Sequence, residues 1–264
     1  MISRSQSHHL YPHIGTKKRA TSLEMKTVEL VFIPSPSIGH LVPMVETAKL
    51  LVERDDRLII TILVMKLSFD TSIDACTKSL ASINKRIRLI DLPQEEPNSS
   101  STPVDFMTSY VENKKPYVKD VVNKLTQTDH QSGSNSPRLA GFVIDIMCTT
   151  MIDVANEFGI PTYLFIATSA AFLGSMFHLQ ELHDEHNQDV ADFKDSNIEF
   201  VIPSFVNPVP VNVLSSVVLD KNQSHVFHSI SRRFRETKGI IINTFLELEP
   251  YATTRKITFS VNLC

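Results

Sequence analysis

Short apolar runs without polar alternation recur along the chain, and segments with helical spacing separate them. Each run has the length of one strand, and an uninterrupted apolar strand is typical of burial on both faces. Buried strands that alternate with helices predict a parallel sheet covered by helices on both sides. We therefore expect an α/β fold with a Rossmann-like, doubly wound parallel sheet. The expected strands are Val28–Ile33, Leu58–Val64, Arg86–Leu92, Ala140–Ile146, Thr162–Ile166 and Gly239–Asn243.

The segments between these runs predict the helices. One helical pattern begins at Pro43, which we place at the first helical position, where a proline is tolerated. The region Pro103–Leu125 predicts a helix interrupted near Pro116, and the polar stretch Thr126–Pro137 predicts a surface loop. The remaining expected helices are Ile73–Ile83, Thr149–Phe158, Ala170–His186 and Val226–Thr237.

Composition excludes several function classes. The chain has 264 residues, a net charge of −3 and 42% hydrophobic residues, as in an ordinary globular protein. It lacks the basic clusters that phosphate contacts need, which argues against a nucleic-acid partner. Its three cysteines form no C-x-x-C pair, so we expect a reducing compartment, the cytoplasm. Seven glycines, with no G-x-G-x-x-G motif and no P-loop, argue against a self-contained dinucleotide or nucleotide site.

Two segments raise questions of targeting. The stretch Phe158–Phe177 carries no charged residue, yet it contains Gly159 and Pro161. We interpret it as a strand, a turn and a helix start rather than a membrane span. Residues 1–24 are nearly free of acids, and we expect a disordered extension; a transit peptide is the alternative.

One histidine and one carboxylate fall where a doubly wound sheet binds its ligands, beyond the carboxyl ends of the strands at the point where strand order reverses. With the expected strand order 3-2-1-4-5, the first and fourth strands flank that point. His40 follows the first strand, and Asp145 ends the fourth. Such a pair suits general-base catalysis, because the carboxylate orients the imidazole and stabilises its protonated form. Helix capping or a turn contact is the alternative.

A second group of polar residues invites a metal hypothesis. It comprises His178, Glu181, His183, Asp184, Glu185 and His186. The group lacks the spacing of H-E-x-x-H, so we interpret it as a solvated helix face and expect no metal site. His225 and His228 flank two apolar residues and predict a partly packed helix. Cys148 predicts a small core residue, and without a G-x-S-x-G elbow a hydrolase is disfavoured.

Three separated blocks resemble one family of enzymes. The first, at 28–54, reads VELVFIPSPSIGHLVPMVETAKLLVER and resembles the opening of plant family-1 UDP-dependent glycosyltransferases. The second, at 139–174, reads LAGFVIDIMCTTMIDVANEFGIPTYLFIATSAAFLG, and the third, at 239–252, reads GIIINTFLELEPYA. The third is similar to the stretch that closes the N-terminal domain of this family. The resemblance covers residues 25–252.

The resemblance implies a GT-B fold, in which an N-terminal domain binds the acceptor and a C-terminal domain binds the UDP-sugar. It implies transfer of a sugar, with glucose as the expected one, to a hydroxyl group with inversion and without a metal or other cofactor. The UDP-sugar is a co-substrate. His40 matches the general base of the family, and Asp145 matches the carboxylate that orients it.

The resemblance also suggests binding residues. Family members carry a Thr or Ser after the fifth strand that touches the sugar; here Ala167 stands in that place, and Thr168 or Ser169 is the candidate. The expected acceptor is a small hydrophobic molecule such as a phenol, flavonoid or terpenoid. The candidate acceptor-binding residues, which could equally be core residues, are Ile38, Ile146, Met147, Phe172 and Met176.

One departure from the family is large. Its nucleotide-sugar signature is rich in tryptophan, and this chain has no tryptophan. We therefore expect residues 25–252 to form the acceptor-binding domain, residues 253–264 to be a divergent tail, and the UDP-sugar-binding domain to be absent. A chain truncated in this way is expected to be inactive alone. A non-catalytic module that binds an apolar metabolite is the alternative, and a chain that does not fold stably is a third.

Overall fold

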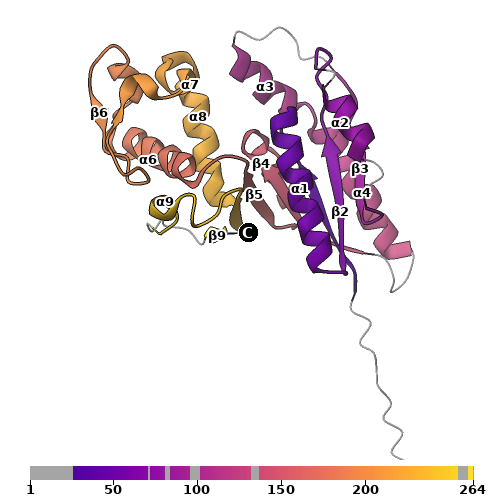
Figure 1. Ribbon diagram of the computed structural model, residues 1–264. Coiled ribbons are helices and arrows are strands. Elements are labelled where there is room, and N and C mark those ends of the chain that lie inside the picture. Colours follow the sequence, from indigo (N-terminus) through magenta and orange to yellow (C-terminus); the bar gives the residue numbers. More distant parts are fainter. Residues whose placement is uncertain are drawn as a thin grey trace, which may run out of the picture.

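Parallel strands form the main sheet of the computed structural model, which describes residues 26–70, 72–80, 84–95, 102–131, 137–254 and 261–263. Within these residues the sheet has seven strands in the order β3-β2-β1-β4-β5-β8-β9 (Figure 1). A separate antiparallel pair consists of β6 (Glu199–Phe200) and β7 (Val209–Pro210). The strands of the main sheet are β1 (Val28–Ile33), β2 (Leu58–Val64), β3 (Ile87–Asp91), β4 (Arg138–Asp145), β5 (Thr162–Ile166), β8 (Gly239–Ile242) and β9 (Val261–Leu263).

The doubly wound arrangement that the sequence predicts is confirmed. From β1 the sheet grows in one direction through β2 and β3, and in the other through β4, β5 and β8. Every neighbouring pair in it is parallel, and the expected order 3-2-1-4-5 holds. The reversal of order therefore lies between β1 and β4.

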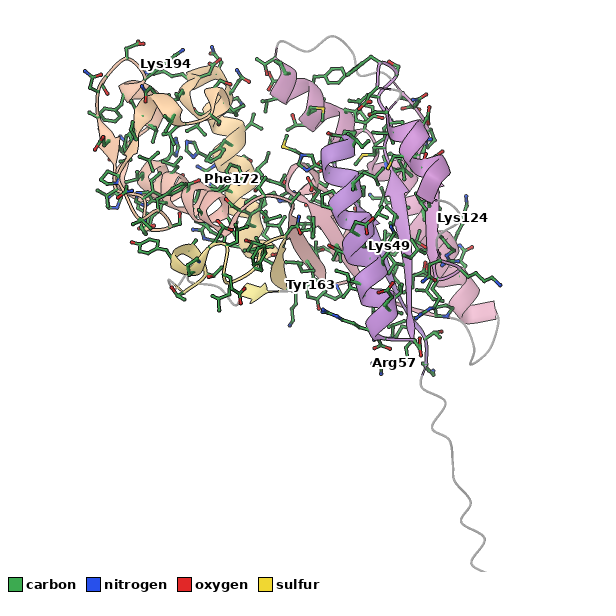
Figure 2. The ribbon with its side chains drawn as sticks, viewed as in Figure 1. Lys49, Arg57, Lys124, Tyr163, Phe172 and Lys194 are labelled. Atoms are coloured by element: carbon green, nitrogen blue, oxygen red, sulfur yellow. The ribbon has the colours of Figure 1, made fainter. Side chains whose placement is uncertain are left out.

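Helices cover both faces of this sheet. They are α1 (Ile38–Arg54), α2 (Ser72–Leu80), α3 (Pro103–Glu112), α4 (Lys115–Gln131), α5 (Met151–Glu157), α6 (Ala170–His186), α7 (Ser216–Leu219), α8 (Lys221–Arg233) and α9 (Pro250–Thr254). Short 3-10 turns connect some of them: η2 (Ile146–Cys148), η3 (Val190–Phe193), η4 (Val211–Val213) and η5 (Phe234–Glu236). Side chains fill the space between helices and strands (Figure 2).

Alternation along each strand divides the core in two. In β1, Phe32 packs with the buried face of α1, whereas Val31 and Ile33 pack on the opposite side with residues of α3 to α6 and α8. This follows from the two-residue period of a strand, which sends successive side chains to opposite faces. Because both faces are covered, apolar residues occupy both sets of positions, which explains the uninterrupted apolar runs in the sequence.

Two boundaries predicted from the sequence are wrong. Helix α1 begins at Ile38, not at Pro43, because the backbone N–H groups of His40 and Leu41 already donate to the Ser37 carbonyl. Pro43 therefore lies inside the helix. The expected loop Thr126–Pro137 is helical as far as Gln131, the end of α4.

Other boundaries differ by a few residues or lie outside the description. Helix α8 begins at Lys221 rather than Val226, because the Asp220 carboxylate accepts a hydrogen bond from the Asn222 N–H and caps the helix. The break near Pro116 is confirmed, since α3 ends at Glu112 and α4 begins at Lys115. The expected extension 1–24 lies outside the described residues, as do residues 81–83 of the predicted helix Ile73–Ile83. In the expected tail, β9 pairs in parallel with β8.

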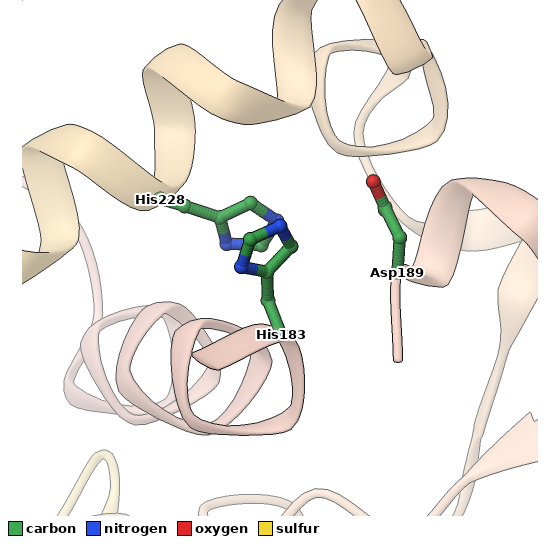
Figure 3. A group of neighbouring side chains, drawn as sticks. All are labelled: His183, Asp189 and His228. Atoms are coloured by element: carbon green, nitrogen blue, oxygen red, sulfur yellow. The ribbon is translucent and has the colours of Figure 1, made fainter. Parts of the chain in front are cut away.

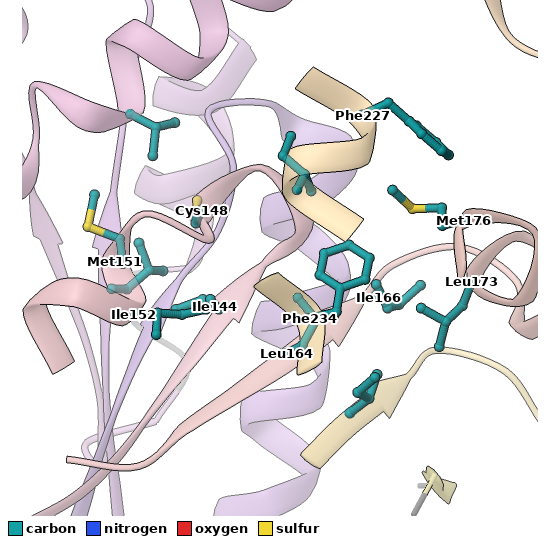
Figure 4. Packing of buried hydrophobic residues seen from close by; sticks show 14 of the residues in the cluster. Ile144, Cys148, Met151, Ile152, Leu164, Ile166, Leu173, Met176, Phe227 and Phe234 are labelled. Carbon is teal, nitrogen blue, oxygen red and sulfur yellow. The ribbon is translucent and has the colours of Figure 1, made fainter. Parts of the chain in front are cut away.

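Phe234 joins the α6–α8 layer to the sheet. Its side chain is buried, and Figure 4 shows it beside Leu164 and Ile166 of β5. The Phe177 ring meets it edge-on with ring centroids 6.0 Å apart. Apolar burial thus extends from β5 into the space between α6 and α8. Among the described residues, no helix is long and apolar enough to cross a membrane.

Gly174 of α6 approaches the segment after β6 closely. A Cβ atom at this position would lie 2.4 Å from Ser204 Cβ, closer than non-bonded atoms tolerate. Ser204 is itself held there, because its hydroxyl donates to the Ala171 carbonyl at 2.8 Å. Glycine at position 174 therefore permits the contact between α6 and this segment.

We expect Gly174→Ala to lower the free energy of unfolding by about 1–3 kcal/mol, the usual effect of overpacking. Alanine normally stabilises a helix interior relative to glycine by about 1 kcal/mol, so the sign distinguishes the steric effect from propensity. Urea unfolding followed by circular dichroism measures it. Gly39→Ala in α1 is the matched control, because its nearest contact would be at 3.9 Å. A stabilised Gly174→Ala variant would contradict the packing argument.

Candidate functional site

The carboxyl ends of β1 and β4 bring His40 and Asp145 together. Parallel pairing sets Ile33 opposite Ile144, so Asp145 is the next residue beyond the last pair. A four-residue turn follows β1, and His40 lies in the first turn of α1. The His40 Nδ1 atom is 3.0 Å from Asp145 Oδ2. The two residues are 105 positions apart in sequence, so the sheet topology alone makes them neighbours.

The environment of the two side chains is asymmetric. Asp145 is fully buried, whereas 31% of the His40 side chain is exposed. A carboxylate only accepts hydrogen bonds, so His40 Nδ1 donates to it and Nε2 keeps its lone pair. The hydrogen bond from His40 to Asp145 raises the pKa of His40 above its usual 6.5, burial opposes this, and the charge of Asp145 adds to the rise. The pair can therefore take a proton at Nε2 from a molecule bound at the sheet edge.

Ser35 is a third member that sequence reasoning missed. Its hydroxyl donates a hydrogen bond to Asp145 Oδ1, the oxygen that His40 does not use. Ser35 is buried and belongs to the turn that follows β1. Both carboxylate oxygens are thus held, which fixes the plane of the carboxylate toward the imidazole. The only signal in the sequence was a hydroxyl residue in the turn between β1 and α1.

Cys148 lies behind this group. Its Sγ is 3.9 Å from Ser35 Oγ, and its side chain is fully buried. Burial, and then the charge of Asp145, raise the pKa of the thiol well above its usual value. A protonated buried thiol is a poor nucleophile, so the core interpretation of Cys148 fits the structure.

The five candidate acceptor-binding residues fall into two groups. Ile38 is exposed at the start of α1, and Ile146 and Met147 are half-buried in η2, directly after Asp145. These three flank the His40–Asp145 pair in sequence on both sides. Phe172 is half-buried on α6 (Figure 2), whereas Met176 on the same helix is 2% exposed and belongs to the core.

The two candidate sugar-binding residues also differ. Thr168 is exposed. The Ser169 hydroxyl accepts a hydrogen bond from the Phe172 N–H at 3.1 Å and so caps α6. Thr168 is therefore the residue of the two whose side chain faces solvent.

Glu249 organises the same helix end, and the sequence did not single it out. Its carboxylate accepts hydrogen bonds from the Ala170 N–H at 2.7 Å, the Ala171 N–H at 3.1 Å and the Thr244 hydroxyl at 2.7 Å. Burial raises the pKa of Glu249, but these hydrogen bonds outweigh it and leave the pKa below its usual value. A charged Glu249 thus ties the segment after β8 to the start of α6.

A hollow of about 450 Å³, open to solvent and lined by aromatic and polar side chains, lies at the same edge of the sheet, beyond β2 and β3. The Phe106 and Tyr110 rings of α3 are stacked with centroids 6.4 Å apart, and Phe69 lies 6.4 Å from Phe106. Phe69 is 74% exposed. The lining residues are Lys66, Leu67, Ser68, Phe69, Gln94, Glu95, Phe106 and Tyr110.

The acid- and histidine-rich end of α6 is only partly the solvated face that the sequence predicts. Asp184 is exposed, as are Glu181, Glu185 and His186, whereas His178 and His183 are half-buried. Asp184 also pairs with Arg232 of α8, and His183 contacts Asp184 at 2.9 Å. In the expected helix around HVFH, His225 is exposed and Phe227 and His228 are buried, so this helix is partly packed, as predicted.

Most of the chain is similar to one half of plant UDP-glycosyltransferases. It is 51% identical over 233 residues to UDP-glucose flavonoid 3-O-glucosyltransferase 6 of Fragaria ananassa, covering 86% of this chain and 47% of that protein. It is 44% identical over 228 residues to UDP-glycosyltransferase 100 of Panax ginseng, covering 85% and 47%. The solved structure of Medicago truncatula UGT71G1 complexed with UDP-glucose superposes with a TM-score of 0.74 at 35% identity, covering 86% of this chain and 48% of that one. The chain thus spans about half the length of the relatives it matches, and no family model matches it.

We expect Asp145→Asn to lower the pKa of His40 below 6.5, because burial then acts without the carboxylate's opposing hydrogen bond and charge. Nuclear magnetic resonance titration of the His40 ring measures this pKa. An unchanged His40 pKa in Asp145→Asn would contradict the pairing.

The raised pKa of His40 also makes its contribution to stability depend on pH. In the wild type, His40 stabilises the fold fully below its unfolded-state pKa and loses this contribution as pH rises through the folded-state pKa. The difference in unfolding free energy between wild type and His40→Gln should therefore shrink as pH rises.

Proposed function

The chain is a homologue of the plant UDP-glycosyltransferases that corresponds to their N-terminal half, and we propose that it provides the acceptor site and general base of such an enzyme. The observation that carries the proposal is the His40–Asp145 pair at the point where strand order reverses. The proposed donor is a UDP-sugar, with UDP-glucose as the first candidate, and the proposed acceptor is a hydroxyl group of a small hydrophobic plant metabolite.

In the proposed reaction, His40 Nε2 removes the proton of the acceptor hydroxyl. Asp145 accepts the Nδ1 hydrogen bond and stabilises the imidazolium that forms, and Ser35 holds the carboxylate in place. The acceptor oxygen attacks the anomeric carbon from the side opposite the UDP. A carbon–oxygen bond to the acceptor forms, the bond to the diphosphate breaks, and the configuration at the anomeric carbon inverts. UDP leaves with the electron pair.

The surroundings of the pair suit an apolar acceptor. Ile38 and the η2 residues Ile146 and Met147 adjoin His40 and Asp145 in the chain and offer apolar surface. Phe172 is a further candidate on α6, and it packs against the core cluster to which Met176 belongs. Several apolar surfaces and one base are what a flat aglycone with a single reacting hydroxyl requires. A flavonoid, the substrate class in the strawberry relative's name, is the first acceptor to test.

Donor binding is proposed to depend on a second part. The described residues contain no glycine-rich phosphate loop, and the relatives extend over about twice the matched length. We assign the UDP contacts to a C-terminal half like that of the relatives. Exposed Thr168 is the residue on this side for contact with the sugar.

A fusion of residues 25–252 to the C-terminal half of the strawberry relative tests the proposal. We expect transfer from UDP-glucose to members of a flavonoid panel, and a loss of about 10²–10⁴ in kcat with His40→Ala, the usual worth of a general base. Because the neutral imidazole is the base, kcat/KM should rise with pH through the raised His40 pKa. His186→Ala, an exposed histidine on α6, is the control and should be unaffected. A fully active His40→Ala fusion would sink the mechanism.

A non-catalytic binding module is the second candidate, and the aromatic hollow of Phe69, Phe106 and Tyr110 favours it, since apolar binding there needs no donor. Calorimetry of the 264-residue chain with a flavonoid separates the two. Binding that Phe106→Ala weakens, combined with an inactive fusion, would support the module. Binding accompanied by transfer in the fusion supports the enzyme.

A further inference from the structure

Three potential metal ligands meet between α6 and α8 (Figure 3). His183 comes from the last turn of α6, His228 from the middle of α8, and Asp189 from the segment before η3. One ligand atom of each lies within 4.8 Å of the others. The imidazole rings are stacked with centroids 4.2 Å apart, and Figure 3 shows a ring nitrogen of each on the side toward Asp189.

His228 is the residue that most needs a partner. It is 1% exposed, and neither of its ring nitrogens has a hydrogen-bond partner among the residues that the structure describes. Leaving such groups buried and unpaired costs free energy, so a ligand that engages a ring nitrogen would stabilise this helix interface.

His183 is oriented for the same purpose. Its Nδ1 atom is 2.9 Å from Asp184 Oδ1, and because a carboxylate only accepts, Nδ1 donates and Nε2 keeps its lone pair. Arg232 Nη2 is farther from Nδ1, at 3.4 Å, and the Arg232 charge is paired with Asp184 through a 2.6 Å contact between Nε and Oδ2. A carboxylate behind the non-binding nitrogen is the usual support of a histidine that ligates a metal.

Asp189 is also held. Its Oδ1 atom accepts the Ala191 N–H at 2.9 Å, and its Oδ2 atom accepts the Ser224 hydroxyl at 3.1 Å. Each carboxylate oxygen can accept a second interaction, so these contacts fix the Asp189 carboxylate and still leave lone pairs for a ligand. The site thus offers two imidazole nitrogens and one carboxylate oxygen as ligands.

We propose that His183 Nε2, a ring nitrogen of His228 and the Asp189 carboxylate bind a zinc ion, with water as the fourth ligand. This donor set and number suit tetrahedral Zn²⁺. With bonds of about 2.1 Å, ligand atoms lie about 3.4 Å apart. Binding therefore draws the three side chains together and turns the two stacked rings, so that the nitrogen lone pair in the plane of each ring points at the ion. The ion ties α6 to α8 and η3, and its role is structural.

Calorimetric titration of ZnCl₂ into chelator-treated 264-residue protein tests the site. Three histidines near the start of the sequence could bind zinc themselves, so the titrations use a background variant that replaces them with glutamine. They are His8, His9 and His13. In this background we expect one equivalent of Zn²⁺ to bind at micromolar concentration and to raise the melting temperature. His183→Gln and Asp189→Asn should each weaken binding at least tenfold. His186→Gln, an exposed neighbour on α6, is the matched control and should bind as before.

Three results would overturn the proposal. The first is the absence of stoichiometric binding at micromolar zinc. The second is unchanged affinity in both His183→Gln and Asp189→Asn. The third is equal weakening by His186→Gln, which would assign the ion to the exposed face of α6. His228 itself is not replaced, because loss of its buried ring would confuse binding with unfolding. Co²⁺ tests the coordination geometry instead: tetrahedral d–d bands should appear in the background variant and vanish in His183→Gln.

Discussion

The parallel pairing of β1 with β4 is the constraint on which the rest of the molecule depends. Strand order reverses across this pair, so the connections from β1 and from β4 leave the same edge of the sheet on diverging paths. Helix α1 packs on one face with Phe32, and the helices after β4 pack on the other. The space between the two paths is where Ser35, His40 and Asp145 meet. A one-residue slip of β4 would turn Asp145 away from this edge and reverse every buried position of the strand.

The sheet was predictable from the sequence because its strands are buried on both faces. Uninterrupted apolar runs of strand length, such as Leu58–Val64, indicate burial on both sides, and their separation by helical patterns specifies parallel pairing. The helix ends were less predictable. Pro43 resembles a start signal, yet the hydrogen bonds to the Ser37 carbonyl begin the helix more than a turn earlier. The sequence analysis missed the cap Asp220 and therefore placed the start of α8 too late. The last turns of α4 are polar, and their composition resembles that of a loop.

The residues of the candidate site also divide into those that the sequence could predict and those that it could not. His40 and Asp145 could be paired from strand order alone, because topology determines which strand ends are adjacent. Ser35 and Glu249 could not, since their roles depend on side-chain direction within irregular segments. His183 and His228 show most clearly what the sequence could not predict. Each fits the polar and apolar pattern of its own helix, and only the packing of α6 against α8 brings the two rings together.

Glu249 has a consequence for where a nucleotide can bind. The start of a helix offers free N–H groups and a positive dipole end, and many α/β proteins place a phosphate there. At α6 a carboxylate from the same chain already occupies that position and accepts the N–H groups of Ala170 and Ala171. A diphosphate that approached this helix would meet a negative charge and filled donors. The Glu249 carboxylate therefore occupies the position at which many α/β proteins bind a phosphate, and its charge disfavours phosphate binding at the start of α6.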